Sequence, residues 1–282
     1  MTAHPIATRL RQHFVARFGT IPTDPPIVIG ATGGSGTRAL HAALAAAGVY
    51  MGARLNGAGD AMDFEPFLDD VINPVLTITR SPDYRLEDLP PDMRRRWTRR
   101  LTGIARLHVA DGGSMEWGWG WKNPRSMYIL PLIAAVVPEF RFVHLVRDGR
   151  DMALSSNQNQ TRKHFEALFG EAAPEVPEHA NIRLWARANS AVADWGERAL
   201  GERYLRVRFE DLCAAPGPII NRILAMLPSP ARHGVDIARR SAAEVSAPES
   251  IERWRTLDPT VMTALAGEAS DVLTRFGYPL ET

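Results

Sequence analysis

The sequence predicts a single α/β domain in which a central parallel sheet of four or five strands carries helices on both faces. From residue 27 onward short apolar runs alternate with helical patterns, and several runs are apolar throughout, as expected for strands buried on both faces. No break in composition divides the 282 residues, so one domain over residues 1–282 is favoured over two. Hydrophobic residues make up 45% of the chain and charged residues 23%, which is typical of a globular enzyme with a self-supporting core.

Charge and residue content narrow the functional classes. A formal net charge of +1 argues against a nucleic-acid partner, because nonspecific binding to a polyanion needs many clustered cations. Cys213 is the only cysteine, which excludes an internal disulfide, and the eight histidines do not cluster at ligand spacing, so no metal site is expected. The sequence has neither a signal-peptide core nor a stretch that approaches the roughly 20 apolar residues of a membrane span. We therefore expect a cytoplasmic protein.

The first elements follow from apolar spacing and turn residues. Residues 1–24 predict a polar leader helix that packs on an edge of the domain and ends in the turn PTDPP. Its apolar face comprises Ile6, Leu10, Phe14 and Phe18. A strand over 27–29 then enters a glycine-rich turn and a helix over about 37–47, which a glycine ends. Residues 49–51 are a second strand candidate.

The middle of the chain alternates charged helices with apolar strands. An acidic, turn-rich stretch leads into a short helix and contains Asp60, Asp63, Glu65, Asp69 and Asp70. The arginine-rich helix over about 92–108 is interpreted as a solvated face rather than a nucleic-acid patch. Three alternate tryptophans predict a strand that ends at Lys122, before a helix that runs to about 137. The run RFVHLV over 141–146 predicts a buried strand, and a helix follows over 148–160.

The last third is mostly helical. After a loop over 170–180, a long helix places Trp185, Val192 and Trp195 on one apolar face. A further strand is predicted over 204–207, then a helix over 218–226 and a final amphipathic helix that ends at Phe276. Polar residues that follow the strands, such as Arg147, are expected at the carboxyl edge of the sheet, where open parallel sheets bind ligands.

The stretch 27–40, IVIGATGGSGTRAL, points most directly to function. A helix that begins on a glycine-rich turn presents free backbone N–H groups and the positive end of its dipole, which attract phosphate or another oxyanion. The nucleotide loop of phosphate-binding NTPases has this order but requires a lysine just before the Ser or Thr at the helix start, and the first lysine here is Lys122. No convincing strand ends in an Asp that would hold magnesium, and the glycine spacing of dinucleotide folds is absent.

Several further motifs occur in a fixed order along the chain. The loop residues Gly34, Ser35, Gly36, Thr37 and Arg38 have the form x-Ser-Gly-Thr-x at a helix start. Arg147 ends a strand and is followed by an Arg-Asp pair that contains Asp151, and then by Ser155 eight residues after the first Arg. A Lys-x-Pro element lies at 122–124, and Phe209 opens an aromatic-Glu-Asp element. The chain closes with Arg-Trp-Arg and Phe-Gly-Tyr.

Together, over about residues 27–278, these motifs resemble the sulfotransferases that use 3'-phosphoadenosine 5'-phosphosulfate (PAPS) as donor. The resemblance implies a P-loop-like nucleotide-binding fold, adenosine 3',5'-bisphosphate as product, and no metal. The 5'-phosphosulfate would contact residues 34–38, the 3'-phosphate would contact Arg147 and Ser155, and Phe209 would stack on the adenine. Two alternatives stay open, namely that Arg147 pairs with Asp151 at the surface and that Phe209 is a core residue.

The catalytic groups are less clear from the motifs. Many relatives carry a Lys or Arg immediately before the loop Ser, where this chain has Gly34, so charge on the leaving oxygen must be neutralised from elsewhere. Lys122 is preferred because it resembles the active-site lysine of the Lys-x-Pro branch, with Arg38 as second candidate. Asp60 is predicted as the general base from its place in the acidic region, and Asp63, Glu65 or a histidine are alternatives. The family's C-terminal Arg-Lys-Gly element is missing, and Arg253 or Arg255 is expected to replace it.

The sequence therefore predicts a sulfotransferase that acts on a hydroxyl or amine of a small metabolite, glycan or lipid. A phosphate-loop kinase that uses ATP and magnesium, and a non-enzymatic nucleotide-binding module, are the alternatives. A homodimer is left open. The run NQNQ over 157–160 is interpreted either as hydrogen-bonding a polyhydroxylated acceptor or as a helix end.

Overall fold

The computed structural model describes residues 5–112, 115–227 and 235–280. Within these ranges a parallel sheet of four strands runs in the order β2-β1-β3-β4. The strands are β1 (Ile27–Gly30), β2 (Gly120–Lys122), β3 (Arg141–Val146) and β4 (Tyr204–Arg208). Ile29 pairs with Lys122 and Gly30 with His144, so the carboxyl ends of the strands meet at one edge. The predicted α/β fold with a parallel sheet is confirmed.

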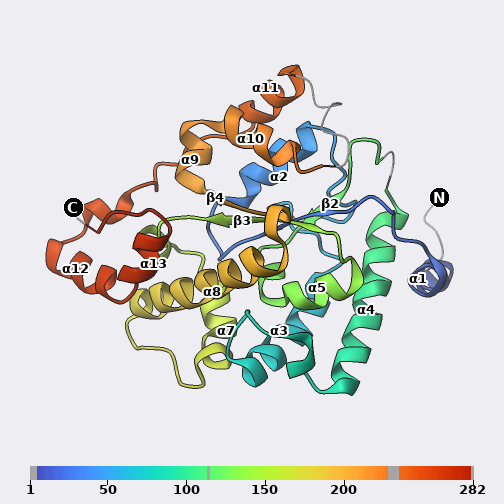
Figure 1. Cartoon of the computed structure of the whole chain (residues 1–282), viewed down its shortest axis with the longest axis horizontal. Helices are drawn as coiled ribbons and strands as arrows, with labels where there is room; N and C mark the ends of the chain where they lie inside the picture. Colours follow the sequence, from blue (N-terminus) through green and yellow to red (C-terminus); the bar gives the residue numbers. More distant parts are fainter. Residues whose placement is uncertain (1–4, 113–114, 228–234, 281–282) are drawn as a thin grey trace.

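Helices cover both faces of the sheet, as Figure 1 shows. On one face lie α2 (Thr37–Ala46), α9 (Phe209–Ala214), α10 (Pro216–Leu224) and α11 (Val235–Ala243). On the other lie α3 (Glu65–Thr79), α4 (Pro91–Ala110), α5 (Leu130–Val136) and α8 (Pro177–Ala199). Alternation along β1 explains the two layers, because Ile27 and Ile29 enter the first core while Val28 enters the second.

A third apolar cluster joins the C-terminal helices to the end of α8. It packs Trp185, Trp254 and Phe276 between α8, α6 (Gly149–Ala153), α12 (Pro259–Gly267) and α13 (Ser270–Arg275). The prediction of one final amphipathic helix is wrong, because α12 and α13 are separate helices. The backbone leaves helical geometry between them at Ala269, whose φ is −137°.

Two predicted elements near the sheet also differ from the structure. The strand candidate over 49–51 forms only an isolated bridge between Tyr50 and Trp119, because Gly48 and Gly52 at positive φ turn the chain on either side. The helix expected over 148–160 is interrupted, since α6 ends at Ala153 and α7 (Asn159–Phe169) begins after a turn. Ser155 therefore lies in the turn between two helices rather than one turn into a helix.

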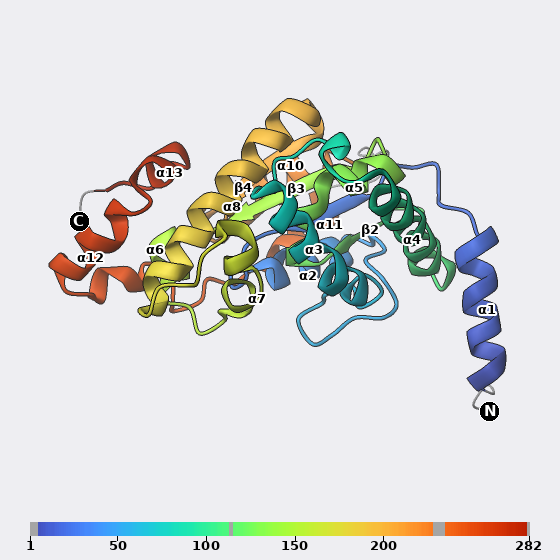
Figure 2. The same cartoon turned by 90° about the horizontal axis from the view of Figure 1, so that it is seen from below.

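The leader forms α1 (Pro5–Phe18), which lies beside α4 at one end of the molecule (Figure 2). Arg106 of α4 donates to the carbonyl oxygens of Ala16 and Arg17 at 3.2 and 2.8 Å, which satisfies the last turn of the helix. The predicted apolar face does not make this contact, because Leu10, Phe14 and Phe18 are more than 60% exposed. The helix instead packs through its opposite side, where Ala16 meets Gly103.

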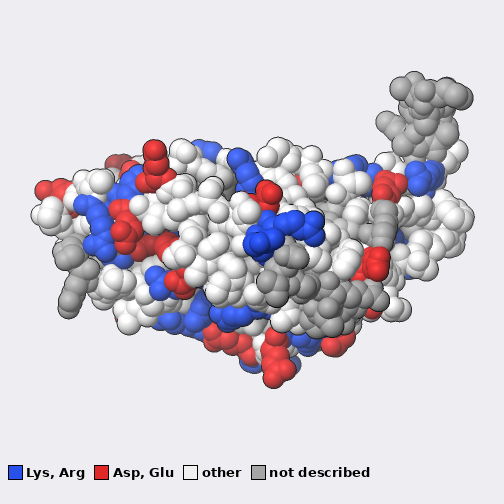
Figure 3. All heavy atoms as spheres, turned by 90° about the horizontal axis from the view of Figure 1, so that it is seen from above, with Lys and Arg blue, Asp and Glu red and all other residues white. Residues whose placement is uncertain are grey.

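Charged residues are mixed over the surface. On the face shown in Figure 3, lysine and arginine side chains lie among aspartate and glutamate. The arginines of α4 are mostly exposed, whereas Trp97 and Leu101 of the same helix are buried, as predicted for a solvated helix face. None of the helices in the described ranges is both long and apolar enough to cross a membrane.

Candidate active site

The loop between β1 and α2 is shaped by two glycines with positive φ, Gly34 at 90° and Gly36 at 85°. A Cβ on Gly36 would lie 2.1 Å from the ring of Phe209, and one on Gly34 would lie 2.8 Å from Ser155 Oγ. Both positions are therefore restricted to glycine by conformation and by space. The contact with Ser155 also explains why a cationic side chain is absent at position 34.

The start of α2 is open toward the carboxyl edge of the sheet. Gly36 is its N-cap residue and provides no side-chain acceptor, so this helix start has no side-chain cap; of the first amides, the N–H of Ala39 donates to the carbonyl oxygen of Gly36 at 3.1 Å. Thr37 is largely buried at the first helical position. Ser35 is also buried, and its hydroxyl donates to the carbonyl oxygen of Thr32 at 2.8 Å. The Ser35 N–H also donates to the carbonyl oxygen of Thr32, at 3.4 Å, so both groups of Ser35 stabilise the turn itself.

A cleft of about 600 Å³ lies against this loop. Among the predicted site residues, those that line it are Gly34, Gly36, Thr37, Arg38, Asp60, Lys122 and Phe209. Further lining residues include Glu65, Asn123, Arg125, Asn157, Asn159, Gln160 and Lys163. Ser35, Arg147 and Ser155 are not among the lining residues. The cleft thus brings together predicted site residues from four separated stretches of the chain, namely 34–38, 60, 122 and 209.

Lys122 and Asp60 form an ion pair in the cleft. Lys122 ends β2, is 1% exposed, and donates from Nζ to Asp60 Oδ1 and to the carbonyl oxygen of Ala58, both at 2.6 Å. Burial lowers the pKa of Lys122, the hydrogen bond to Asp60 opposes this shift, and the charge of Arg38 adds to it. Arg38 is exposed and has no ion-pair partner among the described residues. Lys122 and Arg38, the two cations predicted to compensate for Gly34, thus both line the cleft.

The other predicted acids have structural partners. Glu65 accepts from Asn123 Nδ2 at 2.7 Å and pairs with Arg125 at 2.6 Å, which fixes its carboxylate at the cleft wall. Asp63 is bonded to His108 and Arg54. Although burial disfavours its charged form, these bonds hold the pKa of Asp63 below its ordinary value. Asp63 is not among the residues that line the cleft.

The histidines differ in their surroundings. His144 is fully buried between Tyr204 and Asn189, and burial lowers its pKa to about 3, so it is neutral and structural. His108 bonds Asp63 and the carbonyl oxygen of Gly120. His41 of α2 lies against Gly59, close to the Lys122–Asp60 pair, and its Nε2 has no hydrogen-bond partner in the described chain. Burial lowers the pKa of His41, and the charge of Lys122 acts in the same direction.

Arg147 lies immediately after β3, next to the cleft. Its guanidinium donates to Asp151 Oδ2 at 3.1 Å and to the carbonyl oxygen and hydroxyl of Ser250, and it lies 5.5 Å from the ring centroid of Phe209. Its Nε is buried without a hydrogen-bond partner in the described residues. The pair with Asp151 therefore exists, but it is buried rather than at the surface.

Asp151 joins this region to the C-terminal segment. Its carboxylate accepts from the backbone N–H groups of Glu252 and Trp254 at 2.8 and 3.1 Å, and Arg253 donates to its carbonyl oxygen at 3.0 Å. Arg253 is thus held near Arg147, whereas Arg255 is exposed and pairs with Glu252. Of the two arginines predicted to replace the missing C-terminal element, Arg253 is the better placed.

Sequence reasoning missed several residues of the cleft. Asn123 lies inside the element recognised for its lysine and proline, and Arg125 directly follows it, so their position was available as a signal. Lys163 is one of only two lysines in the chain, which was also a signal. His41 follows the loop by one helical turn, but nothing in its neighbourhood in the sequence distinguishes it from an ordinary helix residue.

Comparisons with known proteins show which family and which solved structures this chain resembles. A family model described as the sulfotransferase family matches residues 25–232. No curated protein matches the chain. Among solved structures, the sulfotransferase STF9 from Mycobacterium avium is 14% identical with a TM-score of 0.57, and the match covers 98% of this chain and 82% of that one.

Two further structures have the same fold. The sulfotransferase domain from the curacin biosynthetic pathway is 15% identical with a TM-score of 0.53, over 91% of this chain and 99% of that one. The sulfotransferase STF1 from Mycobacterium tuberculosis H37Rv is 15% identical with a TM-score of 0.54, over 94% and 81% of the two chains. At such low identities these similarities demonstrate a shared fold.

Proposed function

The chain belongs to the sulfotransferase family, and from this premise we propose that it transfers a sulfuryl group from PAPS to a hydroxyl or amine of a small metabolite, glycan or lipid. Family membership favours this activity over the kinase and the non-enzymatic binding module. The donor, the site residues and the acceptor are the parts that we infer.

The observation that carries the proposal is the uncapped start of α2 at the wall of the cleft. Gly34 and Gly36 bring backbone close to that wall without side chains, which suits a group with several anionic oxygens. Arg38 and Lys122 add positive charge on the same side of the cleft. When bound, the donor supplies the sulfuryl group and departs as adenosine 3',5'-bisphosphate.

Arg147, with Ser155, is our candidate for holding the 3'-phosphate. The unpartnered Nε of Arg147 supports this role, since a buried guanidinium N–H without an acceptor is costly to leave unsatisfied. Ser250 now accepts from the same guanidinium, so the segment that contains it would have to yield room. Phe209 lines the cleft beside Gly36 and is the proposed partner of the adenine.

Lys122 and Asp60 are the proposed catalytic pair. Lys122 donates to the oxygen that becomes negative as the sulfuryl group leaves, and its burial strengthens that interaction. Asp60 takes the proton of the acceptor hydroxyl or amine. Their ion pair fixes both side chains before substrates bind, which limits reorganisation during transfer.

Ligand binding and transfer assays test the proposal. Adenosine 3',5'-bisphosphate should raise the melting temperature and bind in calorimetry, whereas ATP with magnesium should bind far more weakly, because it lacks the 3'-phosphate. When the sulfuryl group of PAPS is labelled, the label should then appear on an acceptor. Preferential binding of ATP with magnesium would contradict the proposed donor.

A further inference from the structure

The outer side of α1 is a surface for which the proposed function gives no use. Leu10, Phe14 and Phe18 are between 61% and 66% exposed, more than any other large apolar side chain in the described part of the chain. They recur every fourth residue and so form an apolar stripe on one side of the helix. The rings of Phe14 and Phe18 lie 5.1 Å apart between centroids. We propose that this stripe, together with exposed arginines of α4, binds an anionic lipid surface.

The stripe faces away from the rest of the protein. α1 packs on α4 through the side that carries Ala16, which meets Gly103. Two residues correspond to a turn of about 200° around a helix, so Phe14 and Phe18, each two positions from Ala16, point away from α4. Figure 1 shows α1 nearly end-on beside α4, and Figure 2 shows it extending past α4 at one end of the molecule. A broad surface can therefore reach the stripe.

The two helices are strongly basic. α1 and α4 together carry nine arginines and one acidic residue, Asp92, although the whole chain has a formal net charge of +1. Arg11 and Arg17 lie three residues to either side of Phe14 and so border the stripe. Asp111, which approaches α1 from the end of α4, is shared between Arg11 at 3.2 Å and a second arginine at 3.5 Å. Positive charge therefore dominates around the stripe.

α4 adds arginines on the side where α1 lies. Arg96 and Arg99 are seven and four residues before Gly103, so they share the face of α4 on which α1 packs. Together with Arg95 they are exposed, and none of the three has an ion-pair partner among the described residues. Clustered cations of this kind repel one another, and an anionic surface relieves that repulsion.

An anionic lipid surface matches both features of this region. An apolar stripe bordered by arginines is typical of helices that lie in a membrane interface, where the rings enter the acyl boundary and the guanidinium groups bind headgroup phosphates. A nucleic acid would pair with the arginines but would leave the rings in water. A second copy of the same helices would cover the rings but would bring equal positive charges together.

Vesicle binding tests the proposal with the full chain. Co-sedimentation compares vesicles of phosphatidylcholine and phosphatidylglycerol with vesicles of phosphatidylcholine alone. We expect partitioning onto the anionic vesicles to be stronger by about tenfold or more, since each arginine near an anionic surface strengthens binding by roughly fivefold. This partitioning should weaken as salt concentration rises. Equal partitioning onto both kinds of vesicle, or none onto either, would overturn the proposal.

Two double variants connect the binding to the proposed residues. Phe14→Gln with Phe18→Gln removes the rings, and Arg96→Gln with Arg99→Gln removes two charges. Each pair should lower partitioning onto anionic vesicles by about tenfold or more. The four side chains are exposed, so the melting temperature and the affinity for adenosine 3',5'-bisphosphate should stay near the parental values.

Matched controls make the same changes elsewhere on the surface. Val176→Gln with Val261→Gln removes two apolar side chains that are 51% and 49% exposed, beside α8 and on α12. Arg222→Gln with Arg240→Gln removes two exposed charges from α10 and α11, which cover the opposite face of the sheet from α4. Both controls should leave partitioning unchanged, and equal losses in controls and test variants would contradict a defined surface.

Other partners give different outcomes. Dimerisation of the parent protein that Phe14→Gln with Phe18→Gln abolishes, without any vesicle binding, would assign the stripe to a second copy. Binding of a single-stranded RNA oligonucleotide more tightly than anionic vesicles would assign the arginines to a nucleic acid. Either result would overturn the lipid assignment. Vesicle binding is measured without PAPS, so its outcome is independent of the proposed function.

Discussion

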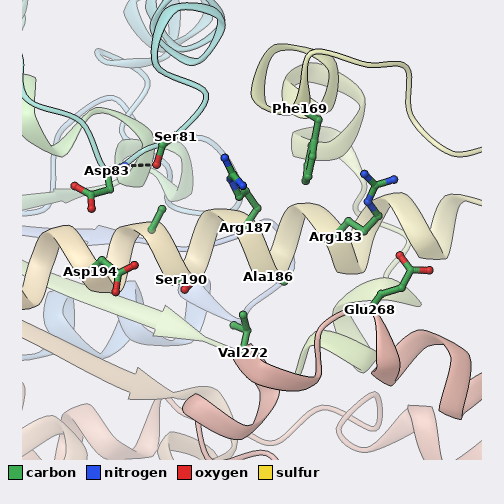
Figure 4. A pocket seen from close by; sticks show the side chains of 11 residues that line it. Ser81, Asp83, Phe169, Arg183, Ala186, Arg187, Ser190, Asp194, Glu268 and Val272 are labelled. Atoms are coloured by element: carbon green, nitrogen blue, oxygen red, sulfur yellow. Dashed lines mark hydrogen bonds between the residues drawn. The ribbon is translucent and has the colours of Figure 1, made fainter. Parts of the chain in front are cut away.

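Two hollows of similar size lie on different sides of this molecule, and their contents differ. One is the cleft of about 600 Å³ at the carboxyl edge of the sheet. The other, of about 490 Å³, lies along α8 and is shown in Figure 4. In that view Arg183 and Arg187 extend from α8 on the side of Phe169, and Asp83 lies next to Ser81.

In the hollow along α8 the charged side chains are satisfied by the protein itself. Their partners are Glu171 for Arg183, the carbonyl oxygen of Arg80 for Arg187, Arg198 for Asp83, Arg275 for Asp194, and His179 for Glu268. Arg183 also lies 5.0 Å from the ring centroid of Phe169. The cleft at the sheet edge differs, because the start of α2 has no side-chain cap and Arg38 has no ion pair within the described chain.

The comparison indicates that volume alone does not identify the ligand site. Protein groups that are already paired gain little from a ligand, because each new hydrogen bond replaces an existing one. Unsatisfied donors at a helix start gain fully when an anion arrives. The predictions below test whether this difference decides function, beginning with the change expected to have the largest effect.

Gly36→Ala should weaken donor binding more than any of the substitutions that follow. The added Cβ would be strained at a φ of 85° and would lie 2.1 Å from the ring of Phe209, so loop and ring cannot keep their positions together. We expect the affinity for adenosine 3',5'-bisphosphate in calorimetry to fall about a hundredfold or more, from strain and loop displacement that cost a few kcal/mol. Gly217→Ala is the control, since a Cβ there meets no atom within 4 Å. Near-parental affinity in Gly36→Ala would show that the loop does not bind the donor.

Lys122→Ala should reduce turnover far more than donor binding. Loss of a preorganised donor to the leaving oxygen is expected to lower kcat by about 10² to 10³, with a much smaller change in bisphosphate affinity. Single-turnover assays with labelled PAPS measure this difference. Equal losses in kcat and affinity would assign Lys122 to binding alone, and unchanged kcat would remove it from the mechanism.

The pH dependence of turnover gives a second readout for Lys122. Because burial lowers the pKa of this lysine, it loses its proton at a lower pH than an exposed lysine does. Turnover should therefore decrease as pH rises through that pKa. In Lys122→Arg, whose guanidinium stays charged, any remaining activity should not decrease in this range. A decrease at the same pH in that variant would point to another group.

Arg147→Ala should weaken binding of ligands that carry a 3'-phosphate. We expect a loss between about tenfold and a thousandfold for adenosine 3',5'-bisphosphate, since a dianion loses a charged hydrogen-bond partner. Adenosine 5'-phosphate, which lacks the 3'-phosphate, should lose much less. The contrast matters because Arg147 also pairs with buried Asp151, and a purely structural loss would weaken both ligands equally.

Much of the fold could be predicted because local patterns and tertiary packing agree. The runs at Ile27–Gly30 and Arg141–Val146 are buried on both faces in the sheet as their uniform apolarity indicates. The break between α6 and α7 was not predicted, and at this break Ser155 lies against Gly34 of another segment. The orientation of α1 was also not predictable. The apolar stripe suggests that it packs on the domain, but the helix instead contacts Gly103 and Arg106 of α4 through its other side.

In the candidate site, too, some features could be predicted from the sequence and others could not. Backbone features such as Gly34 and Gly36 could be read from sequence, because conformation restricts residue type directly. Ion pairs could not, since the partner of Lys122 is 62 residues away and the partner of Glu65 is chosen by the approach of α3 to the residues after β2. Asp60 and Glu65 look alike in the sequence, and only the structure shows that Asp60 pairs with Lys122 while Glu65 pairs with Arg125.

Arg187→Ala should have the smallest effect. The side chain is exposed in the hollow along α8, and its loss removes one hydrogen bond to Arg80, which should lower the free energy of unfolding by no more than about 1 kcal/mol. Bisphosphate affinity and turnover should stay within about twofold of the parent, a change worth less than RT ln 10. If the hollow along α8 bound either substrate, a large drop in affinity or turnover would occur while the melting temperature stayed near the parental value. That result would make the hollow along α8 the functional site, although its charges are already paired. It would leave the start of α2, which has no side-chain cap, without a role.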